Sequence, residues 1–213
     1  MLVTLALCPT DSPGLELGEH PELFSPERRE QLARCLPQTR RESVAGRLLL
    51  SHLLRERCPD LPLPPRLDFG AWEKPRLRDL SGVYFNISHS EGWAVCALCE
   101  AEVGVDLQKN RNIYPGIAKR FAPAEQAMLE RIPEPERACA LCQLWTLKEA
   151  YCKCTGEGLS APLDAAVFTL DPLGIDRPGY QVLCPPPPAP EWALSLCVRT
   201  RERVQVEQRV LKL

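Results

Sequence analysis

The sequence predicts an α/β (α+β) protein built from two similar lobes related by pseudo-twofold symmetry. Two pairs of matching segments support this fold class. LFSPERREQL at residues 23–32 resembles RFAPAEQAML at residues 120–129, and GWAVCAL at residues 92–98 resembles EWALSLC at residues 191–197. The two offsets, 97 and 99 residues, are nearly equal. Chance similarity is the alternative, but equal offsets favour an internal duplication.

The first copy is expected to form an N-terminal lobe over residues 1–100. An apolar run predicts a strand at Leu2–Cys8. Pro26 predicts the start of a helix, because proline is favoured in the first helical turn. Apolar periodicity then predicts a longer helix at Arg41–Arg57. The strands predicted after it are Tyr84–Ile87 and Trp93–Cys99.

The second copy, residues 101–213, repeats this order as a C-terminal lobe. Val103–Leu107 alternates apolar residues with other residues, as a half-buried strand does. A helix is expected from Pro123 and a longer one at Ala138–Cys154. The remaining predicted elements are strands at Val167–Leu170 and Trp192–Val198 and, between them, an extended loop at Pro185–Pro188.

Composition narrows the class of protein. The chain has 213 residues, of which 45% are hydrophobic and 25% charged, an ordinary balance for a folded protein with its own core. The formal net charge of -2 gives no global basic field, so we expect no nucleic-acid partner. No apolar stretch approaches the ~20 residues that a membrane span needs, so we expect no membrane association. The 11 cysteines lie mostly in apolar segments, which favours reduced thiols in a cytoplasmic protein.

The stretch VGVDLQKN, residues 103–110, carries the first candidate site. On a strand, Asp106 and Gln108 emerge on the same side, next to each other. A carboxylate and an amide at a strand end suit a bound cation. The copy of this strand in the first lobe has no acid, so the acidic chemistry is expected in the second lobe alone.

The helical stretch QLWTLKEAYCKCTGEGLS carries the second candidate, Glu149 with Lys153. Residues four apart share one face of a helix. A surface ion pair is the ordinary alternative. An acidic strand end in the same copy and the glycines that close the helix favour a functional pair.

A polar segment and a basic run each have two possible interpretations. FNISHSEGW, residues 85–93, places Asn86, Ser88, His89 and Ser90 in a predicted polar turn. It is either a hydrogen-bonded hairpin turn or a pocket of donors for phosphate oxygens. A basic run without acids is either a solvated face or a rim for a phosphorylated ligand or an acidic protein. Its members are Lys109, Arg111, Lys119 and Arg120.

Taken together, these motifs resemble a known enzyme family. NISHS, GVDLQK, FAPAE and WTLKEAYCK with GEGLS occur in the order found in the surfactin-type 4'-phosphopantetheinyl transferases. The resemblance runs from about Phe24 to Leu170. It implies the 4'-phosphopantetheinyl transferase fold, a pseudo-dimer of two lobes in one chain. It also implies transfer of phosphopantetheine from coenzyme A to a serine of an apo acyl or peptidyl carrier protein.

The same resemblance implies roles for single residues. Asp106 and Glu149 would hold Mg²⁺ on the coenzyme A pyrophosphate. Gln108 stands where many members have a second acid. It would therefore lie next to the metal, and the metal site would have one negative charge fewer. Glu149 would also help to deprotonate the serine, and Lys153 would neutralise the adenosine 3',5'-bisphosphate that leaves. The residues implied in coenzyme A binding are Arg41, Lys74, Ser88, His89, Lys119 and Lys153.

We expect a cytoplasmic monomer with coenzyme A in the cleft between the lobes. Two alternatives stay open at this point. One is a different Mg²⁺-dependent phosphoryl-group enzyme, such as a nucleotide pyrophosphatase, which would release its products into water. The other is a non-catalytic module that binds coenzyme A or a carrier without turnover.

Overall fold

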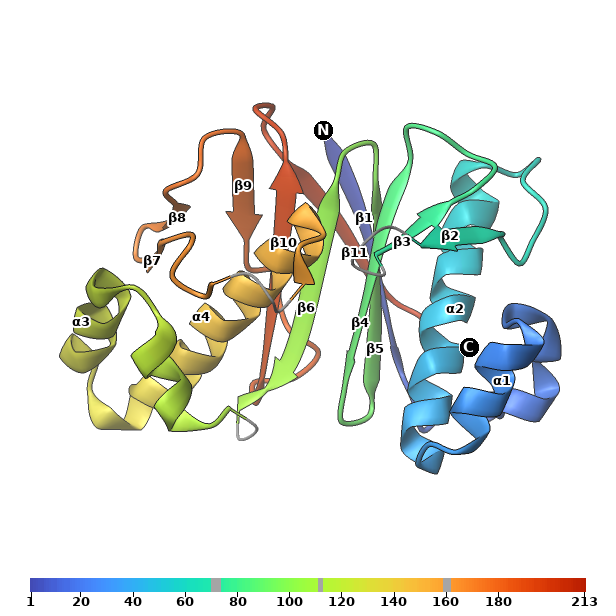
Figure 1. Cartoon of the computed structure of the whole chain (residues 1–213), viewed down its shortest axis with the longest axis horizontal. Coiled ribbons are helices and arrows are strands. Elements are labelled where there is room, and N and C mark those ends of the chain that lie inside the picture. The colour runs from blue at the N-terminus through green and yellow to red at the C-terminus, as the bar shows by residue number, and fades with distance from the viewer. Residues whose placement is uncertain (70–73, 111–112, 159–161) are drawn as a thin grey trace.

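The computed structural model describes residues 1–69, 74–110, 113–158 and 162–213. Two lobes lie side by side, with strands toward the middle of the molecule and helices on the outside (Figure 1). Within the described residues, no helix is both long and apolar enough to cross a membrane.

The N-terminal lobe is a sheet covered by a long helix. The strands β1 (Leu2–Pro9), β5 (Trp93–Cys99) and β4 (Tyr84–Ser90) lie in that order and pair antiparallel. Helix α2 (Pro37–Arg57) packs on their outer face. The smaller elements are the 3-10 helices Leu17–Glu19 and Pro21–Leu23, helix α1 (Pro26–Ala33), and the paired short strands β2 (Leu67–Phe69) and β3 (Pro75–Leu77).

The C-terminal lobe repeats this arrangement. Strands β6 (Val103–Lys109), β10 (Trp192–Arg199) and β9 (Tyr180–Leu183) lie in that order and are antiparallel, and helix α4 (Glu134–Thr155) packs on β6 and β10. The smaller elements are the 3-10 helix η4 (Pro115–Arg120), helix α3 (Pro123–Arg131), and the paired strands β7 (Phe168–Leu170) and β8 (Leu173–Ile175).

The strand registers confirm the predicted fold class of two similar lobes. Trp93 lies opposite Pro9 in the first sheet, and Trp192 lies opposite Lys109 in the second. Counted from these tryptophans, the position that matches Asp106 is Ala6, since Ala6 is opposite Cys96 and Asp106 is opposite Ser195. The acid therefore belongs to the second lobe alone.

Buried apolar residues form a central layer and outer clusters. The central layer lies between the two sheets and includes Leu5, Val95, Val105 and Leu194. A second cluster lies between the first sheet and α2. In the C-terminal lobe, Ala150 and Cys154 of α4 pack on Cys197 of β10, and a larger cluster joins α4 to α3 and β7. On β6 the alternation works as the sequence predicts, with valine and leucine turned to the central layer and the residues between them turned to α4.

The long elements are confirmed, and one prediction is wrong. The chain at Asn86, Ser88 and Ser90 is strand, not turn, because β4 continues to Ser90. The turn consists of Glu91 and Gly92, with φ of 34° and 98°, which suits a tight two-residue hairpin. Both long helices also begin earlier than expected, each with a proline in its first turn.

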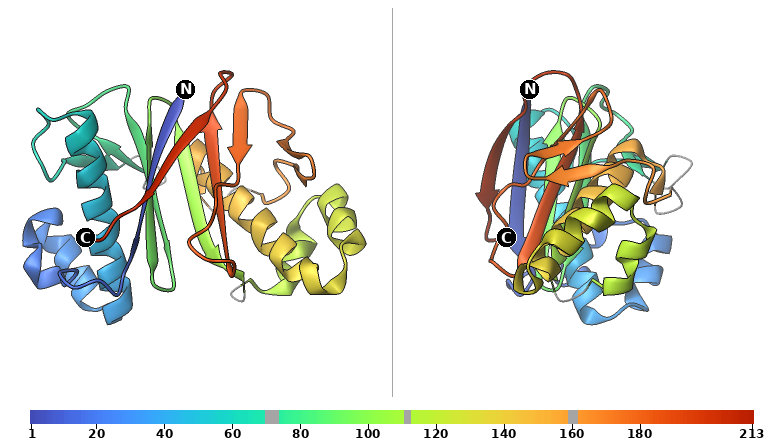
Figure 2. Two further views of the ribbon diagram at one scale, coloured as in Figure 1. Left: turned by 180° about the vertical axis from the view of Figure 1, so that it is seen from behind. Right: turned by 90° about the vertical axis from the view of Figure 1, so that its left-hand side faces the viewer.

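The last strand, β11 (Gln205–Val210), crosses to the first lobe and pairs in parallel with β1 (Figure 2). The first sheet therefore has the order β11-β1-β5-β4. The division of the chain at residue 100 stays a prediction, and it did not include this crossing.

Candidate active site

Gly104 brings helix α4 into contact with strand β6. A Cβ atom at this position would lie 2.0 Å from the Ala150 carbonyl oxygen and 2.5 Å from the Cys154 backbone nitrogen. Only a residue without a side chain permits this distance between the two backbones. The close approach places the last two turns of α4 directly beside the side chain of Asp106, two residues further along the strand.

Three polar side chains from two lobes meet at that point. Lys153 Nζ donates to Asp106 Oδ1 (2.7 Å), to Ser88 Oγ (3.0 Å) and to the Val105 carbonyl oxygen (3.2 Å). Ser88 Oγ donates to Asp106 Oδ1 (2.9 Å) and accepts from the Leu107 backbone nitrogen (3.3 Å). The N-terminal lobe supplies Ser88, and the C-terminal lobe supplies the acid and the lysine. The candidate site therefore lies at the junction of the lobes.

Glu149 lies one helical turn before Lys153, on the same face of α4. The pKa of Glu149 is raised to about 7, mainly by burial and then by the negative charge of Asp106, while Lys153 acts to lower it. Two buried carboxylate oxygens, Asp106 Oδ2 and Glu149 Oε1, have no hydrogen-bond partner in the described structure. Buried polar atoms are normally paired, so these two oxygens are suited to bind a cation.

Strand β4 binds the edge of β6 through side chains. Asn86 Oδ1 accepts from the Val105 backbone nitrogen (3.0 Å), and Ser90 Oγ accepts from the Lys109 nitrogen (3.3 Å). Ser88 makes the same contact between them. Because alternate strand residues point to one side, this polar row faces β6 along its whole length. These hydrogen bonds explain why polar residues stand inside a strand where a turn was predicted.

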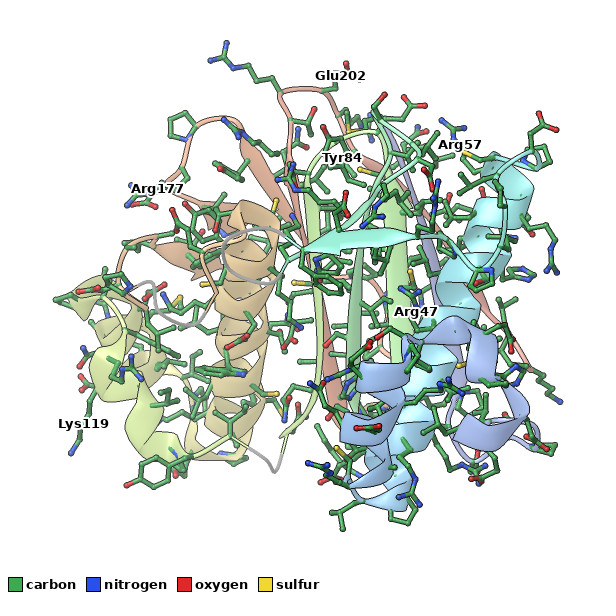
Figure 3. All side chains as sticks on the ribbon, turned by 45° about the vertical axis from the view of Figure 1, so that its right-hand side comes forward. Arg47, Arg57, Tyr84, Lys119, Arg177 and Glu202 are labelled. Atoms are coloured by element: carbon green, nitrogen blue, oxygen red, sulfur yellow. The ribbon has the colours of Figure 1, made fainter. Side chains whose placement is uncertain are left out.

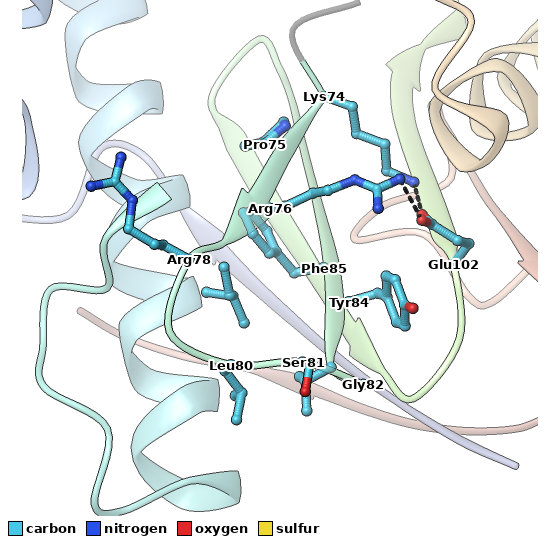
Figure 4. Close-up of a pocket in the computed structure, with 12 residues that line it drawn as sticks. Lys74, Pro75, Arg76, Arg78, Leu80, Ser81, Gly82, Tyr84, Phe85 and Glu102 are labelled. Atoms are coloured by element: carbon cyan, nitrogen blue, oxygen red, sulfur yellow. Dashed lines mark hydrogen bonds and ion pairs between the residues drawn. The ribbon is translucent and has the colours of Figure 1, made fainter. Parts of the chain in front are cut away.

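Lys74 joins the lobes at the other end of β6. Its Nζ forms an ion pair with Glu102 and donates to the Cys154 carbonyl oxygen (2.8 Å) at the end of α4. Glu102 also pairs with Arg76 (2.8 Å). These three side chains border a cavity of ≈ 220 Å³ beside β3 and the start of β4 (Figure 4). The predicted role of Lys74 in coenzyme A binding stays a prediction, and here the lysine links the lobes.

The remaining predicted residues lie away from Asp106. His89 follows Ser88 on β4 but faces the opposite side, where its Nδ1 is 3.0 Å from Glu42 Oε2. The Arg41 side chain donates to the carbonyl oxygens of residues 10 and 12 and to a glutamate at position 16. Lys119 is exposed at the far end of the C-terminal lobe (Figure 3). Arg111 lies outside the described residues. The binding roles assigned to these residues stay predictions.

Gln108 lies two residues after Asp106 on the side of β6 that faces α4. Among the residues that the structure describes, no cluster of three or more His, Cys, Asp or Glu side chains could hold a metal ion by itself. The arrangement is instead one of two carboxylates, with a neutral amide nearby. A metal held here would need ligands from a substrate or from water.

Sequence reasoning missed a second buried pair in the same helix. Lys148 Nζ is 2.7 Å from Glu125 Oε2, and both side chains are almost fully buried. The lysine also donates to the carbonyl oxygens of Leu163 (2.6 Å) and Ala166 (3.1 Å). The pair ties α3 and the chain after residue 162 to α4, one residue before Glu149. Helical periodicity held a signal, because Lys148 follows Leu144 by four positions on the apolar stripe.

Comparison with known proteins identifies the family. A family model described as the 4'-phosphopantetheinyl transferase superfamily matches residues 102–197. The 4'-phosphopantetheinyl transferase HetI of Nostoc sp. is 33% identical over 175 residues, which are 77% of this chain and 72% of that protein. The chain belongs to the 4'-phosphopantetheinyl transferase superfamily. The resemblance to surfactin-type transferases is thereby confirmed.

Other members of this transferase superfamily match in the same way. A Synechocystis sp. protein, named provisionally as a 4'-phosphopantetheinyl transferase, is 38% identical over 76% of this chain and 68% of its own length. The transferase Sfp of Bacillus subtilis is 32% identical over 67% of this chain and 64% of its own length. The matches therefore span 64% to 72% of these relatives. A solved holo-[acyl-carrier-protein] synthase of Thermotoga maritima covers 48% of this chain and 64% of its own, at 18% identity and a TM-score of 0.41.

Proposed function

We propose that this transferase moves the 4'-phosphopantetheine group of coenzyme A onto a serine of an apo acyl or peptidyl carrier protein. Adenosine 3',5'-bisphosphate is the other product. The observation that carries the proposal is the pair of buried carboxylates, Asp106 and Glu149, each with an unpaired oxygen beside Lys153. The family relationship supports neither a nucleotide pyrophosphatase nor a non-catalytic binding module.

The two carboxylates fit a magnesium ion. Mg²⁺ takes oxygen ligands and is often held by one or two carboxylates together with substrate phosphates. Asp106 Oδ2 and Glu149 Oε1 are buried and unpaired, and the raised pKa of Glu149 reflects in part the repulsion between the two groups. Gln108 offers a neutral oxygen or leaves its place to water. When bound, the ion would neutralise the pyrophosphate and favour attack on it.

Glu149 and Lys153 are placed to move protons and charge. Glu149, whose pKa is raised to about 7 in the metal-free protein, would accept the proton of the serine. The serine oxygen then forms a bond to the β-phosphorus of coenzyme A, and the bond from that phosphorus to the leaving phosphate oxygen breaks. Lys153, four residues along the same face of α4, neutralises the negative charge that develops on the leaving group.

The carrier protein is placed at the exposed basic end of the C-terminal lobe. Arg120 is exposed there, and Tyr114, at the start of the same 3-10 helix, is 78% exposed. Carriers of this class are acidic, and basic residues at a rim act mainly on the rate of association. Coenzyme A would lie between the lobes of a cytoplasmic monomer, with no nucleic acid or membrane involved.

Intact-mass measurement tests the proposal. Several purified apo carriers are incubated with coenzyme A and Mg²⁺, and the expected result is the gain of one phosphopantetheine on at least one of them. Asp106→Ala and Glu149→Ala should each abolish the gain while circular dichroism shows an intact fold, because each variant loses a carboxylate of the same site. Cleavage of coenzyme A without a carrier would favour the pyrophosphatase, and binding without turnover would favour the module. Unchanged transfer by either variant would contradict the site.

A further inference from the structure

Glu42 is a buried carboxylate that none of the roles above requires. It lies on α2, is 7% exposed, and contacts the hairpin turn between β4 and β5 at Gly92. Its Oε1 accepts from Gln38 Nε2 (3.0 Å) and from the Gly92 backbone nitrogen (3.4 Å). Its Oε2 is 3.0 Å from His89 Nδ1. Burial alone would raise the pKa of Glu42, but the hydrogen bonds from His89 and Gln38 outweigh it and lower that pKa. The carboxylate is therefore ionised at neutral pH.

The same network reaches a second predicted phosphate-binding residue. Gln38 Nε2 also donates to Thr10 Oγ1 (2.7 Å), and Arg41 Nε donates to the Thr10 carbonyl oxygen (2.8 Å). Glu42 thus lies between Arg41, one position before it in α2, and His89 at the end of β4. The two predicted binding residues are connected by hydrogen bonds through one buried carboxylate.

A buried charge is costly unless it is paired, and an apolar residue would serve the packing of α2 better. The contact with His89 therefore explains why a charged residue stands at this buried position. A carboxylate that binds one nitrogen of a histidine fixes the orientation of the ring and directs the other nitrogen outward. The His89 side chain is 39% exposed while its Nδ1 is engaged, so the rest of the ring is open to a ligand.

The position of His89 indicates which phosphate of coenzyme A it would bind. Ser88, Asp106 and Lys153 define the side of β4 on which the pyrophosphate would bind, and His89 is on the other side. Coenzyme A has one more phosphate, the monoester on its ribose. A phosphate monoester carries up to two negative charges and accepts several hydrogen bonds, which suits a ring whose free nitrogen is directed outward by a carboxylate on its other side.

We propose that Glu42 is a positioning residue that orients His89, so that the ring binds the 3'-phosphate of coenzyme A. This inference rests on the proposed function. It assigns Glu42 to recognition of one phosphate and leaves the chemistry to Asp106, Glu149 and Lys153.

Dephospho-coenzyme A, which lacks the 3'-phosphate, is the probe that tests the inference. KM and kcat are measured for coenzyme A and for this analogue, with one apo carrier held at saturation. Glu42→Gln keeps the shape and the acceptor for Gly92 but removes the charge. We expect KM for coenzyme A to rise on the order of tenfold, because a charge-assisted hydrogen bond becomes a neutral one. The values of kcat, and of KM for the analogue, should stay unchanged.

A double variant separates positioning from structure. If Glu42 acts through His89, Glu42→Gln should add nothing to the effect of His89→Ala. Glu56→Gln is the matched control, since Glu56 lies on the same helix and its Oε1 is 3.3 Å from His52 Nε2, away from the site. It should leave both KM values unchanged. Thermal unfolding of every variant checks the fold.

Two results would overturn the inference while the proposed function stands. One is an equal rise in KM for coenzyme A and for the analogue. The other is an undiminished effect of Glu42→Gln in the His89→Ala background. If the wild type modifies no carrier, the proposed function fails, and calorimetric binding of the two nucleotides to the same variants tests Glu42 independently. Equal loss of both affinities in Glu42→Gln would then refute its role.

Discussion

Glu149→Gln should stabilise the metal-free protein at alkaline pH and not at acidic pH. The pKa of Glu149 is raised from 4.5 to about 7, first by burial and then by the charge of Asp106. Between these two values the unfolded chain has released its proton while the folded chain still holds it. Stability therefore falls as pH rises from 4.5 to 7 and levels off above that range.

The magnitude follows from the size of the shift. Each pKa unit corresponds to about 1.4 kcal/mol, so the ionised carboxylate costs about 3 kcal/mol of folding free energy at pH 8. At pH 5 most of this cost is absent, and it is about 1 kcal/mol or less. The amide of Glu149→Gln does not titrate. The difference in unfolding free energy between variant and wild type should therefore grow by about 2–3 kcal/mol from pH 5 to pH 8, which corresponds to about 5–10 °C in Tm.

The assay is urea unfolding followed by circular dichroism at pH 5, 6, 7 and 8 in a chelating buffer. Mg²⁺ is then added at pH 8, where it should raise the urea midpoint of the wild type and have less effect on the variant, because binding to the folded state stabilises it. A difference between wild type and variant that does not change with pH would refute the reasoning. It would mean that Glu149 titrates as it does in the unfolded chain.

Three other substitutions test the structure around the site. Gly104→Ala should destabilise the protein by about 3 kcal/mol or more in urea unfolding and abolish transfer, because the added Cβ would overlap the backbone of α4. Gly18→Ala is the control: the space around Gly18 is open, so stability and transfer should be unchanged. Lys148→Met should cost about 3–5 kcal/mol by leaving the charge of Glu125 buried without its cation. Adding Glu125→Gln should recover part of this loss, and an unchanged stability of Lys148→Met would contradict the buried pair. Gln108→Ala should lower the turnover measured in a Mg²⁺ titration by about 10-fold to 100-fold or less. A collapse as severe as that of Asp106→Ala would make Gln108 a direct ligand.

Local patterns predicted the parts of the site that lie on one element. Alternation along β6 put Asp106 on a known side of a strand, and the four-residue spacing put Glu149 and Lys153 on one face of α4. The ion pair of Lys153 with Asp106, 47 residues away in the chain, was not predicted. Only the packing of α4 on β6 brings the two together.

The missed features depend on pairing across the chain. Ser88 was placed in a turn because polar residues are rare inside strands, and its partner strand begins 15 residues later. Gly104 did carry a signal, since a glycine inside a strand often marks a close backbone approach. The strand β11 was not predicted because its sequence is polar and charged. It lies at the edge of the sheet, where Glu207 and Arg209 can be solvated.

The crossing of β11 links the two ends of the described chain in one sheet. During synthesis, β1 emerges first and can pair with β5, but its other edge has no partner until Gln205–Val210 has been made. A ribosome-bound chain that ends near residue 100 would therefore leave one edge of β1 open to other chains. The two lobes resemble each other, yet the first depends on the last strand for its completion. Separately expressed halves divided at residue 100 should reassemble only when the second half supplies that strand.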